Sequence, residues 1–247
     1  MTAGVQTRER SYGRGPDGLR PVTIEPNFVP SATGSVLMSM GETRVICTAS
    51  HTDGVPKWLS GSGRGWVTAE YGMLPASTGD RKPRDKGKQD GRSVEIQRLI
   101  GRSIRGVVDF QAMGENSIYL DCDVLQADGG TRCASITGAY VALALGIESL
   151  IAQGAIEGSP LTQSVAAIST GIVDGAALLD LDYPEDSTAE VDANVVMTGD
   201  GGLVEVQATA ERTPLSRASL DELLGLAESG IAELRVLQEE AIAAGKA

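Results

Sequence analysis

Histidine, cysteine and aromatic side chains are scarce in this 247-residue chain. His51 is the single histidine, which excludes a His-rich metal site, and nothing around it resembles the nucleophile elbow of a catalytic triad. The three cysteines, Cys47, Cys122 and Cys133, form no CxxC pair of the kind that binds zinc. A small, odd and widely spaced set of cysteines is typical of a reducing cytoplasm.

Long hydrophobic runs are also missing. The longest strongly apolar run, residues 139–147, is much shorter than the roughly 20 residues that a membrane-spanning helix needs. The N-terminal residues are polar, so we expect no secretory signal. With 41% hydrophobic and 22% charged residues, the composition is that of a globular protein whose core is built from aliphatic side chains. We expect a cytoplasmic protein with no membrane partner.

Acidic side chains outnumber basic ones by 33 to 21, and the net charge of −12 argues against a nucleic-acid partner. The basic residues are concentrated, however. Residues 81–105 hold nine basic and three acidic side chains, a net charge of +6 that leaves −18 for the remainder. Such a stretch can bind polyanions by short-range phosphate neutralisation, or it can be a solvated loop followed by the exposed side of a helix. Charge alone leaves both interpretations open.

The hydrophobic pattern predicts several strands followed by a helix, twice over. Strands are predicted over residues 22–28, 34–40, 43–50, 66–74, 117–126, 164–170, 171–173, 177–182, 189–198 and 203–208, with turns at 41–42 and 174–175. A loop over 75–91 precedes a helix capped by Asp90 or Ser93, a buried helix covers 135–152, and a C-terminal helix starts with a Ser219–Glu222 capping box. This order predicts one α+β unit made of two similar halves.

A glycine turn joins the strand at 117–126 to the buried helix. Gly129 and Gly130 allow the backbone to approach a ligand closely, and the following helix N-terminus offers unpaired N–H donors. Thr131 adds a hydroxyl and Arg132 a guanidinium, so the turn is a plausible phosphate cradle, although an exposed turn would look similar. Arg92 would supply a second cation for a phosphate dianion, or it is an ordinary helix-cap or ion-pair residue.

Carboxylates cluster near the start of a strand in the second half, and they are Asp182, Glu185, Asp186, Glu190 and Asp192. On the strand from 189, Glu190, Asp192 and Asn194 share one face, and Asp186 keeps the same parity although Pro184 predicts a loop. Paired carboxylates suit Mg²⁺, which prefers oxygen ligands. A solvated sheet face is the alternative.

Taken together, the segments resemble the ribonuclease PH family of phosphorolytic 3′→5′ exoribonucleases over nearly the whole chain. The most specific stretches are GWVTAEY at 65–71 with MLP at 73–75, GRSVEIQRLIGR at 91–102, DCDVLQADGGTR at 121–132 and EDSTAEVD at 185–192. The chain departs from the usual family pattern at Gly18, Ala76, Cys133, Ala208 and Ala210. None of these positions belongs to the expected phosphate or metal residues.

The resemblance implies a duplicated β-α unit of the ribosomal protein S5 domain 2-like type, with halves of about 12–155 and 156–245, and a homohexamer that is a trimer of dimers. It implies an enzyme that trims the 3′ ends of tRNA precursors and other RNAs with inorganic phosphate, releases nucleoside diphosphates and can add nucleotides in reverse. The implied site residues are Arg92, Gly130, Thr131 and Arg132 for phosphate, Asp186 and Asp192 for catalysis and Mg²⁺, and Arg81, Arg84, Lys86 and Arg98 for RNA.

Phosphorolysis is consistent with a chain that has one histidine, because free phosphate is already anionic at neutral pH and needs no histidine base. Two other hypotheses remain open. An inactive RNA-binding ring subunit is disfavoured because both the arginines and the acids are present. A nuclease that uses water is disfavoured because the glycine turn and Arg92 form a site for an extra anion.

Overall fold

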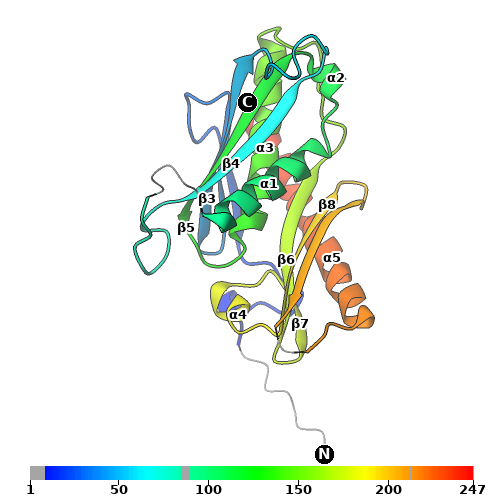
Figure 1. Cartoon of the computed structure of the whole chain (residues 1–247). Coiled ribbons are helices and arrows are strands. Elements are labelled where there is room, and N and C mark those ends of the chain that lie inside the picture. The colour runs from blue at the N-terminus through cyan, green and yellow to red at the C-terminus, as the bar shows by residue number, and fades with distance from the viewer. Residues whose placement is uncertain (1–8, 85–89, 212, 247) are drawn as a thin grey trace, which may run out of the picture.

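The computed structural model describes residues 9–84, 90–211 and 213–246, which form two β-sheets with helices between and beside them (Figure 1). The elements in chain order are η1 (Ser11–Gly13), β1 (Val22–Pro26), β2 (Gly34–Met40), β3 (Thr43–Asp53), β4 (Trp66–Met73), α1 (Gly91–Arg105), α2 (Phe110–Met113), β5 (Asn116–Gln126), α3 (Thr131–Ala152), β6 (Val165–Val173), β7 (Ala176–Leu179), α4 (Tyr183–Asp186), β8 (Val191–Thr198), β9 (Leu203–Ala210) and α5 (Arg217–Gly245).

The first sheet has the order β1-β2-β3-β5-β4, antiparallel except where β4 runs parallel to β5. The predicted turn at 41–42 joins β2 to β3, with Met40 opposite Thr43. In β5 the alternation is as predicted, because Ile118, Leu120, Cys122 and Val124 are buried while Tyr119, Asp121 and Asp123, on the other face, are more exposed. One face of this sheet is therefore available for helix packing.

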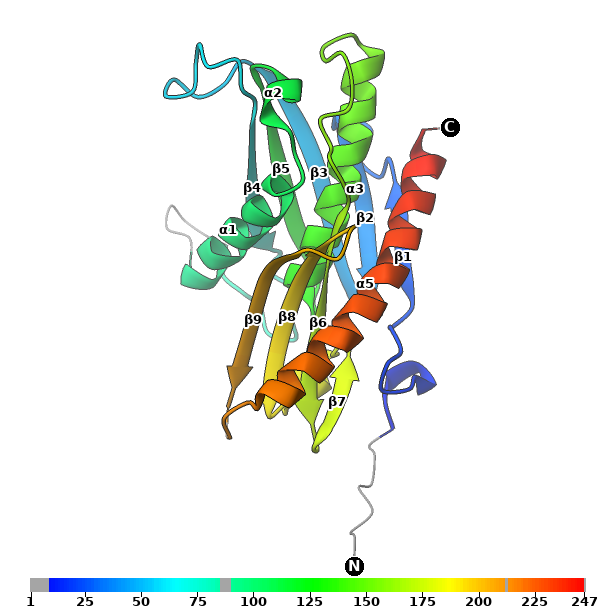
Figure 2. The ribbon, with the colours of Figure 1, turned by 90° about the vertical axis from the view of Figure 1, so that its right-hand side faces the viewer.

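The buried helix α3 is the centre of the fold. It contacts β2 and β3 of the first sheet and β6 of the second, and α5 runs beside it (Figure 2). By length and composition α3 could cross a membrane, but 83% of its apolar window is buried inside the protein, which is typical of a core helix. The second sheet, β7-β6-β8-β9, is antiparallel throughout and rests against α5 through β6.

Four local predictions were wrong. The buried helix starts at Thr131, four residues earlier than predicted, so the glycine turn leads directly into its first turn. The runs at 164–170 and 171–173 are one strand, β6. The expected loop at Pro184 is the short helix α4, where proline occupies a position in the first turn that needs no N–H donor. The C-terminal helix is capped by Ser216 rather than by a Ser219–Glu222 box, because periodicity places helix ends poorly.

The start of α1 is set by Asp90, whose Oδ1 accepts a hydrogen bond from the Ser93 N–H at 2.6 Å. That bond lowers the pKa of Asp90 below its ordinary value of 3.8. Replacing this cap by Ala should cost about 1 kcal/mol of unfolding free energy, measured by denaturant titration at neutral pH. Because the folded-state pKa is depressed, the contribution is present above pH 3.8 and is lost as the pH falls through the folded value.

Asp90→Asn is the control for this prediction, because Asn caps helices nearly as well but does not titrate. It should retain most of the stability and lose the dependence on acidic pH. An Asp90→Ala protein as stable as the unchanged chain would show that the cap does not hold α1.

Candidate functional site: an anion cavity beside two carboxylates

The glycine turn after β5 has the geometry of an anion cradle. Gly129 and Gly130 both have left-handed φ values, 76° and 66°. A Cβ on Gly129 would lie 2.6 Å from the Leu181 carbonyl oxygen, so only glycine allows this close backbone approach. Thr131 and Arg132 then form the first turn of α3, where backbone N–H groups have no partner within the helix.

A cavity of about 640 Å³ opens at this turn. It is lined by every residue predicted for phosphate and metal binding, from segments far apart in the chain, namely Arg92 of α1, Gly130, Thr131 and Arg132 at the start of α3, Asp186 of α4 and Asp192 of β8. The two arginines therefore share one pocket within a single chain. That juxtaposition is the geometric condition for binding a dianion with two guanidinium groups.

Neighbouring side chains hold the anion-binding groups in place. Arg132 donates from Nη1 to the Gln207 Oε1 at 2.8 Å, and the same nitrogen lies 3.5 Å from the Glu95 carboxylate. The Thr131 hydroxyl is 2.9 Å from the Tyr71 hydroxyl, in a buried contact. These contacts restrict the rotamers of both side chains before any ligand arrives, which lowers the entropy cost of binding.

Asp186 and Asp192 are half-buried and close enough to influence each other. Burial raises the pKa of Asp186, whereas the charges of Arg92 and Arg132 oppose the shift. Burial and the neighbouring Asp186 carboxylate together raise the pKa of Asp192 to about 6. Two carboxylates that repel one another in this way form a suitable donor set for Mg²⁺, which is often bound by one or two carboxylates together with substrate phosphate and water.

Comparison with known families identifies the fold. The profile described as 3′ exoribonuclease family, domain 1, matches residues 18–146, and that for domain 2 matches residues 163–230. The chain belongs to the 3′ exoribonuclease family. The predicted α+β fold with a duplicated unit of the ribosomal protein S5 domain 2-like type is thereby confirmed. The domain limits of about 12–155 and 156–245 stay a prediction.

Solved structures of similar fold include three chains. Rrp46 of rice (Oryza sativa) is 16% identical with a TM-score of 0.77, and the alignment covers 94% of this chain and all of that one. A chain of the Archaeoglobus fulgidus exosome with RNA bound to the active site is 24% identical with a TM-score of 0.77, covering 92% of each chain. A chain of an archaeal exosome core is 24% identical with a TM-score of 0.72, covering 94% of this chain and 91% of that one.

The acidic side chains of residues 182–192 do not all line the cavity in this member of the 3′ exoribonuclease family. Asp182 and Glu185 point away from the cavity and pair with arginines of the N-terminal segment. Glu190 precedes β8, does not line the cavity and accepts a hydrogen bond from the Gly175 N–H, so it does not join Asp192 there. The strand predicted from residue 189 begins at Val191, and Asp186 reaches the cavity from α4 rather than from an extended chain.

Arg81, Arg84 and Arg98, which are predicted to bind RNA, do not line the cavity. Arg81 and Arg84 are exposed on the segment before α1, and Arg98 is exposed on α1 itself. Lys86 lies outside the described residues. Their roles remain predictions, and their exposed positions are compatible with contacts to a polyanion at the surface.

Several site residues of this 3′ exoribonuclease family member were missed by sequence reasoning. Lys82 and the exposed Tyr183 line the cavity, while Tyr71 and Gln207 orient its anion-binding groups. Lys82 was in the basic window but was not singled out. The other three carry no local signal, because the sequence around a tyrosine or glutamine looks the same whether the side chain faces a ligand or not.

Replacing Tyr71 by Phe tests the orientation of Thr131. Burial raises the pKa of Tyr71, so its hydroxyl stays protonated and available to Thr131 at neutral pH. The variant keeps the ring packing but loses the hydroxyl contact, so we expect about 1 kcal/mol lower stability and a several-fold higher KM for phosphate. Tyr140→Phe, the same change in a buried tyrosine outside the cavity, is the control. Equal KM values in the two variants would contradict the assignment.

Proposed function

We propose that the chain is a phosphorolytic 3′→5′ exoribonuclease that trims the 3′ ends of tRNA precursors and other RNAs. The observation that carries this proposal is the meeting of Arg92, Arg132 and the glycine turn in one cavity with Asp186 and Asp192. A hydrolytic nuclease has no need for a second anion site beside its carboxylates. An enzyme that uses inorganic phosphate as co-substrate does.

In the proposed reaction a phosphate oxygen attacks the last phosphodiester. A bond forms between that oxygen and the scissile phosphorus, the bond from phosphorus to the 3′ oxygen of the preceding nucleotide breaks, and this oxygen takes up a proton. The products are a nucleoside diphosphate and an RNA one nucleotide shorter, and the reverse reaction adds nucleotides. Arg92, Arg132 and the N–H groups at the start of α3 orient the attacking anion, which supplies much of the rate through positioning.

The chemistry requires no histidine at the cavity. His51 lies outside it and interacts through Nε2 with the Asn116 Oδ1 at 2.8 Å. Asp186 and Asp192 would hold Mg²⁺, which, when bound, neutralises charge that develops on the scissile phosphate. The two carboxylates thus have a binding role, and the arginines offset the repulsion between the attacking phosphate and the RNA phosphate.

RNA would reach the cavity across the basic surface. Arg81, Arg84 and Arg98 are exposed near it, and Lys86 belongs to the same basic window. A single copy with this limited positive charge should bind RNA weakly. A homohexamer built as a trimer of dimers would present several such surfaces at once and gain by multivalency. The RNA bound to the active site in the similar exosome structure supports RNA as the substrate.

The deciding experiment incubates a short 3′-labelled RNA with the protein, with and without inorganic phosphate. We expect shortening only with phosphate, release of nucleoside diphosphates, and extension of the RNA when diphosphates are supplied. Shortening that is independent of phosphate and yields monophosphates would identify a hydrolytic nuclease. Binding without shortening would identify an inactive ring subunit, and light scattering would measure the oligomeric state in the same sample.

A further inference from the structure

Arg20 does not line the cavity, but its side chain links two segments that lead to residues lining it, namely the segment before α4 and the glycine turn. Its side chain is fully buried, with 0% exposure. Three of its donors go to one carboxylate: the backbone N–H, Nε and Nη2 reach the Asp180 oxygens at 2.8, 3.1 and 2.7 Å. The remaining nitrogen, Nη1, donates to the Asp128 carbonyl oxygen at the glycine turn.

On one side Arg20 holds the segment that carries Asp186. Asp180 has a φ of 53°, an uncommon left-handed conformation for a residue other than glycine. Its N–H donates to the Ser169 carbonyl at 2.7 Å, and the Leu181 N–H donates to the hydroxyl of the same serine at 3.0 Å. Asp182 then caps α4, whose last residue is Asp186. The carboxylate segment is therefore attached to β6 and to Arg20 just before α4 begins.

On the other side Arg20 supports the glycine turn. A Cβ on Gly130 would lie 3.1 Å from Arg20 Nη2, so the guanidinium packs directly under the turn. The Thr43 hydroxyl completes the support, because it accepts from the Asp128 N–H at 2.8 Å and donates to the Gly129 carbonyl at 2.7 Å. The turn that positions Thr131 and Arg132 thus rests on Arg20 and on β3.

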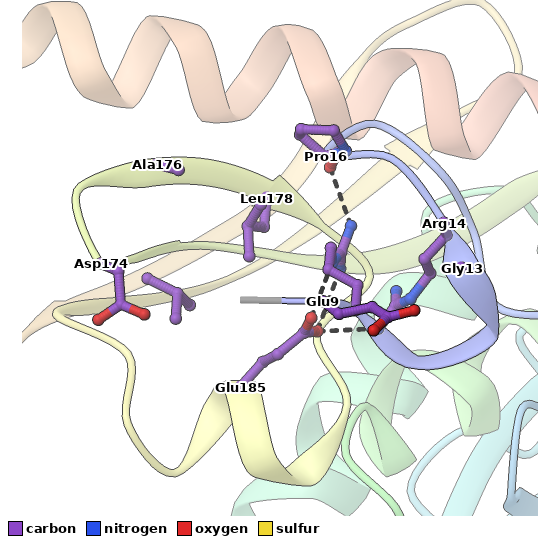
Figure 3. Close-up of a pocket in the computed structure, with 10 residues that line it drawn as sticks. Glu9, Gly13, Arg14, Pro16, Asp174, Ala176, Leu178 and Glu185 are labelled. Atoms are coloured by element: carbon purple, nitrogen blue, oxygen red, sulfur yellow. Dashed lines mark hydrogen bonds and ion pairs between the residues drawn. The ribbon is translucent and has the colours of Figure 1, made fainter. Parts of the chain in front are cut away.

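Two other buried arginines contact the segment around α4 but not the glycine turn. Arg10 of the N-terminal segment pairs with Glu185 at 2.7 Å. Arg14 pairs with the same carboxylate at 2.8 Å (Figure 3). They line part of a second cavity, of about 410 Å³, next to β7. Their other hydrogen bonds go to the Leu179 and Asp180 carbonyl oxygens, to Asp182 and to the N-terminal segment itself. Neither has a hydrogen bond to the glycine turn among the described residues.

We infer that Arg20 is a positioning residue that sets the distance between the phosphate-binding turn and the Asp186 carboxylate of α4. The inference rests on the proposed function. A planar guanidinium has donors on several edges, so one side chain can bind the Asp180 carboxylate and the Asp128 carbonyl together. A lysine at the same place keeps the charge but has a single ammonium group, which cannot reproduce both contacts. The separation of attacking phosphate and metal site would then no longer be fixed, and small misplacements are costly in rate.

The test compares Arg20→Lys with Arg10→Lys, the same charge-conserving change at another buried arginine of the network. Phosphate dependence is measured at saturating RNA, below the unfolding temperature of each variant. For Arg20→Lys we expect at least a tenfold rise in the KM for phosphate and a lower kcat. For Arg10→Lys we expect a similar loss of thermal stability with a KM for phosphate within twofold of that of the unchanged protein.

A purely structural role predicts a different outcome, because a smaller folded fraction lowers kcat without changing KM. A second measurement does not depend on turnover: inorganic phosphate should raise the Tm of Arg10→Lys as it does for the unchanged protein, and should do so much less for Arg20→Lys. Unchanged phosphate affinity in Arg20→Lys, or an equal loss in both variants, would overturn the inference. If the unchanged protein showed no phosphate-dependent shortening, the proposed function would fail first, which keeps the two failures distinct.

Discussion

Replacing Arg132 by Ala should lower kcat/KM for phosphate by about 10²- to 10³-fold, or roughly 2.7–4 kcal/mol of transition-state stabilisation. Arg132 is 17% exposed and is oriented by Gln207 and Glu95, so its guanidinium is already in place when the anion binds. Removing a preorganised donor from a half-enclosed site costs far more than removing a surface charge, because water replaces it poorly there. Steady-state rates at varied phosphate concentration measure the effect.

Arg98→Ala is the matched control for this prediction. Arg98 is exposed on α1 and does not line the cavity, so its loss should weaken RNA binding, more strongly at low salt, and leave the KM for phosphate unchanged. Arg132→Ala should therefore change the dependence of the rate on phosphate, and Arg98→Ala the binding of RNA. If Arg132→Ala raised the KM for RNA and left phosphate dependence intact, Arg132 would be an RNA-binding residue and the proposed phosphate site would be wrong.

Changing Asp186 to Asn should reduce turnover at least a hundredfold, about 2.7 kcal/mol, with RNA binding and folding nearly intact. The amide keeps the size of the side chain but removes the negative charge that would hold Mg²⁺ with Asp192. Burial raises the pKa of Asp186, which means that the charged carboxylate is penalised in the folded protein, so a neutral amide of the same size should change stability little. Single-turnover rates at several Mg²⁺ concentrations, with RNA binding measured separately, report the effect.

Glu190→Gln is the control in the same acidic stretch, since Glu190 lies outside the cavity and faces Gly175. It should behave like the unchanged protein at every Mg²⁺ concentration. Equal losses of RNA binding and turnover in Asp186→Asn would assign a structural role to Asp186. Turnover that persists after Mg²⁺ is removed with a chelator would show that the two carboxylates act without a metal.

The predictions that the structure confirms concern features determined by residues close together in the sequence. The β2–β3 turn, the Asp90 cap, the alternation of β5 and the burial of α3 all depend on residues within a few positions of one another. Two of the four errors arose at helix starts, where tertiary contacts compete with propensity. The helix α3 begins at Thr131 because Gly130 adopts a left-handed conformation against Arg20. Hydrophobic periodicity is visible only from residue 135 onward, and it carries no information about that contact.

From the sequence alone, the order of predicted strands and helices indicates an α+β fold, and turn glycines and charged motifs mark anion- and metal-binding candidates, because these are short-range properties. The resemblance to the ribonuclease PH family implies the particular fold and the role of each residue. The tertiary structure determined which of those charges act together. In the folded chain Asp186 and Asp192 line the cavity with the two arginines. Asp182, Glu185 and Glu190 instead interact with groups outside it. The tertiary structure also placed Arg20 beneath a turn 108 residues further along the chain. Such distances are set by how α3 packs between two sheets, and no local pattern encodes them.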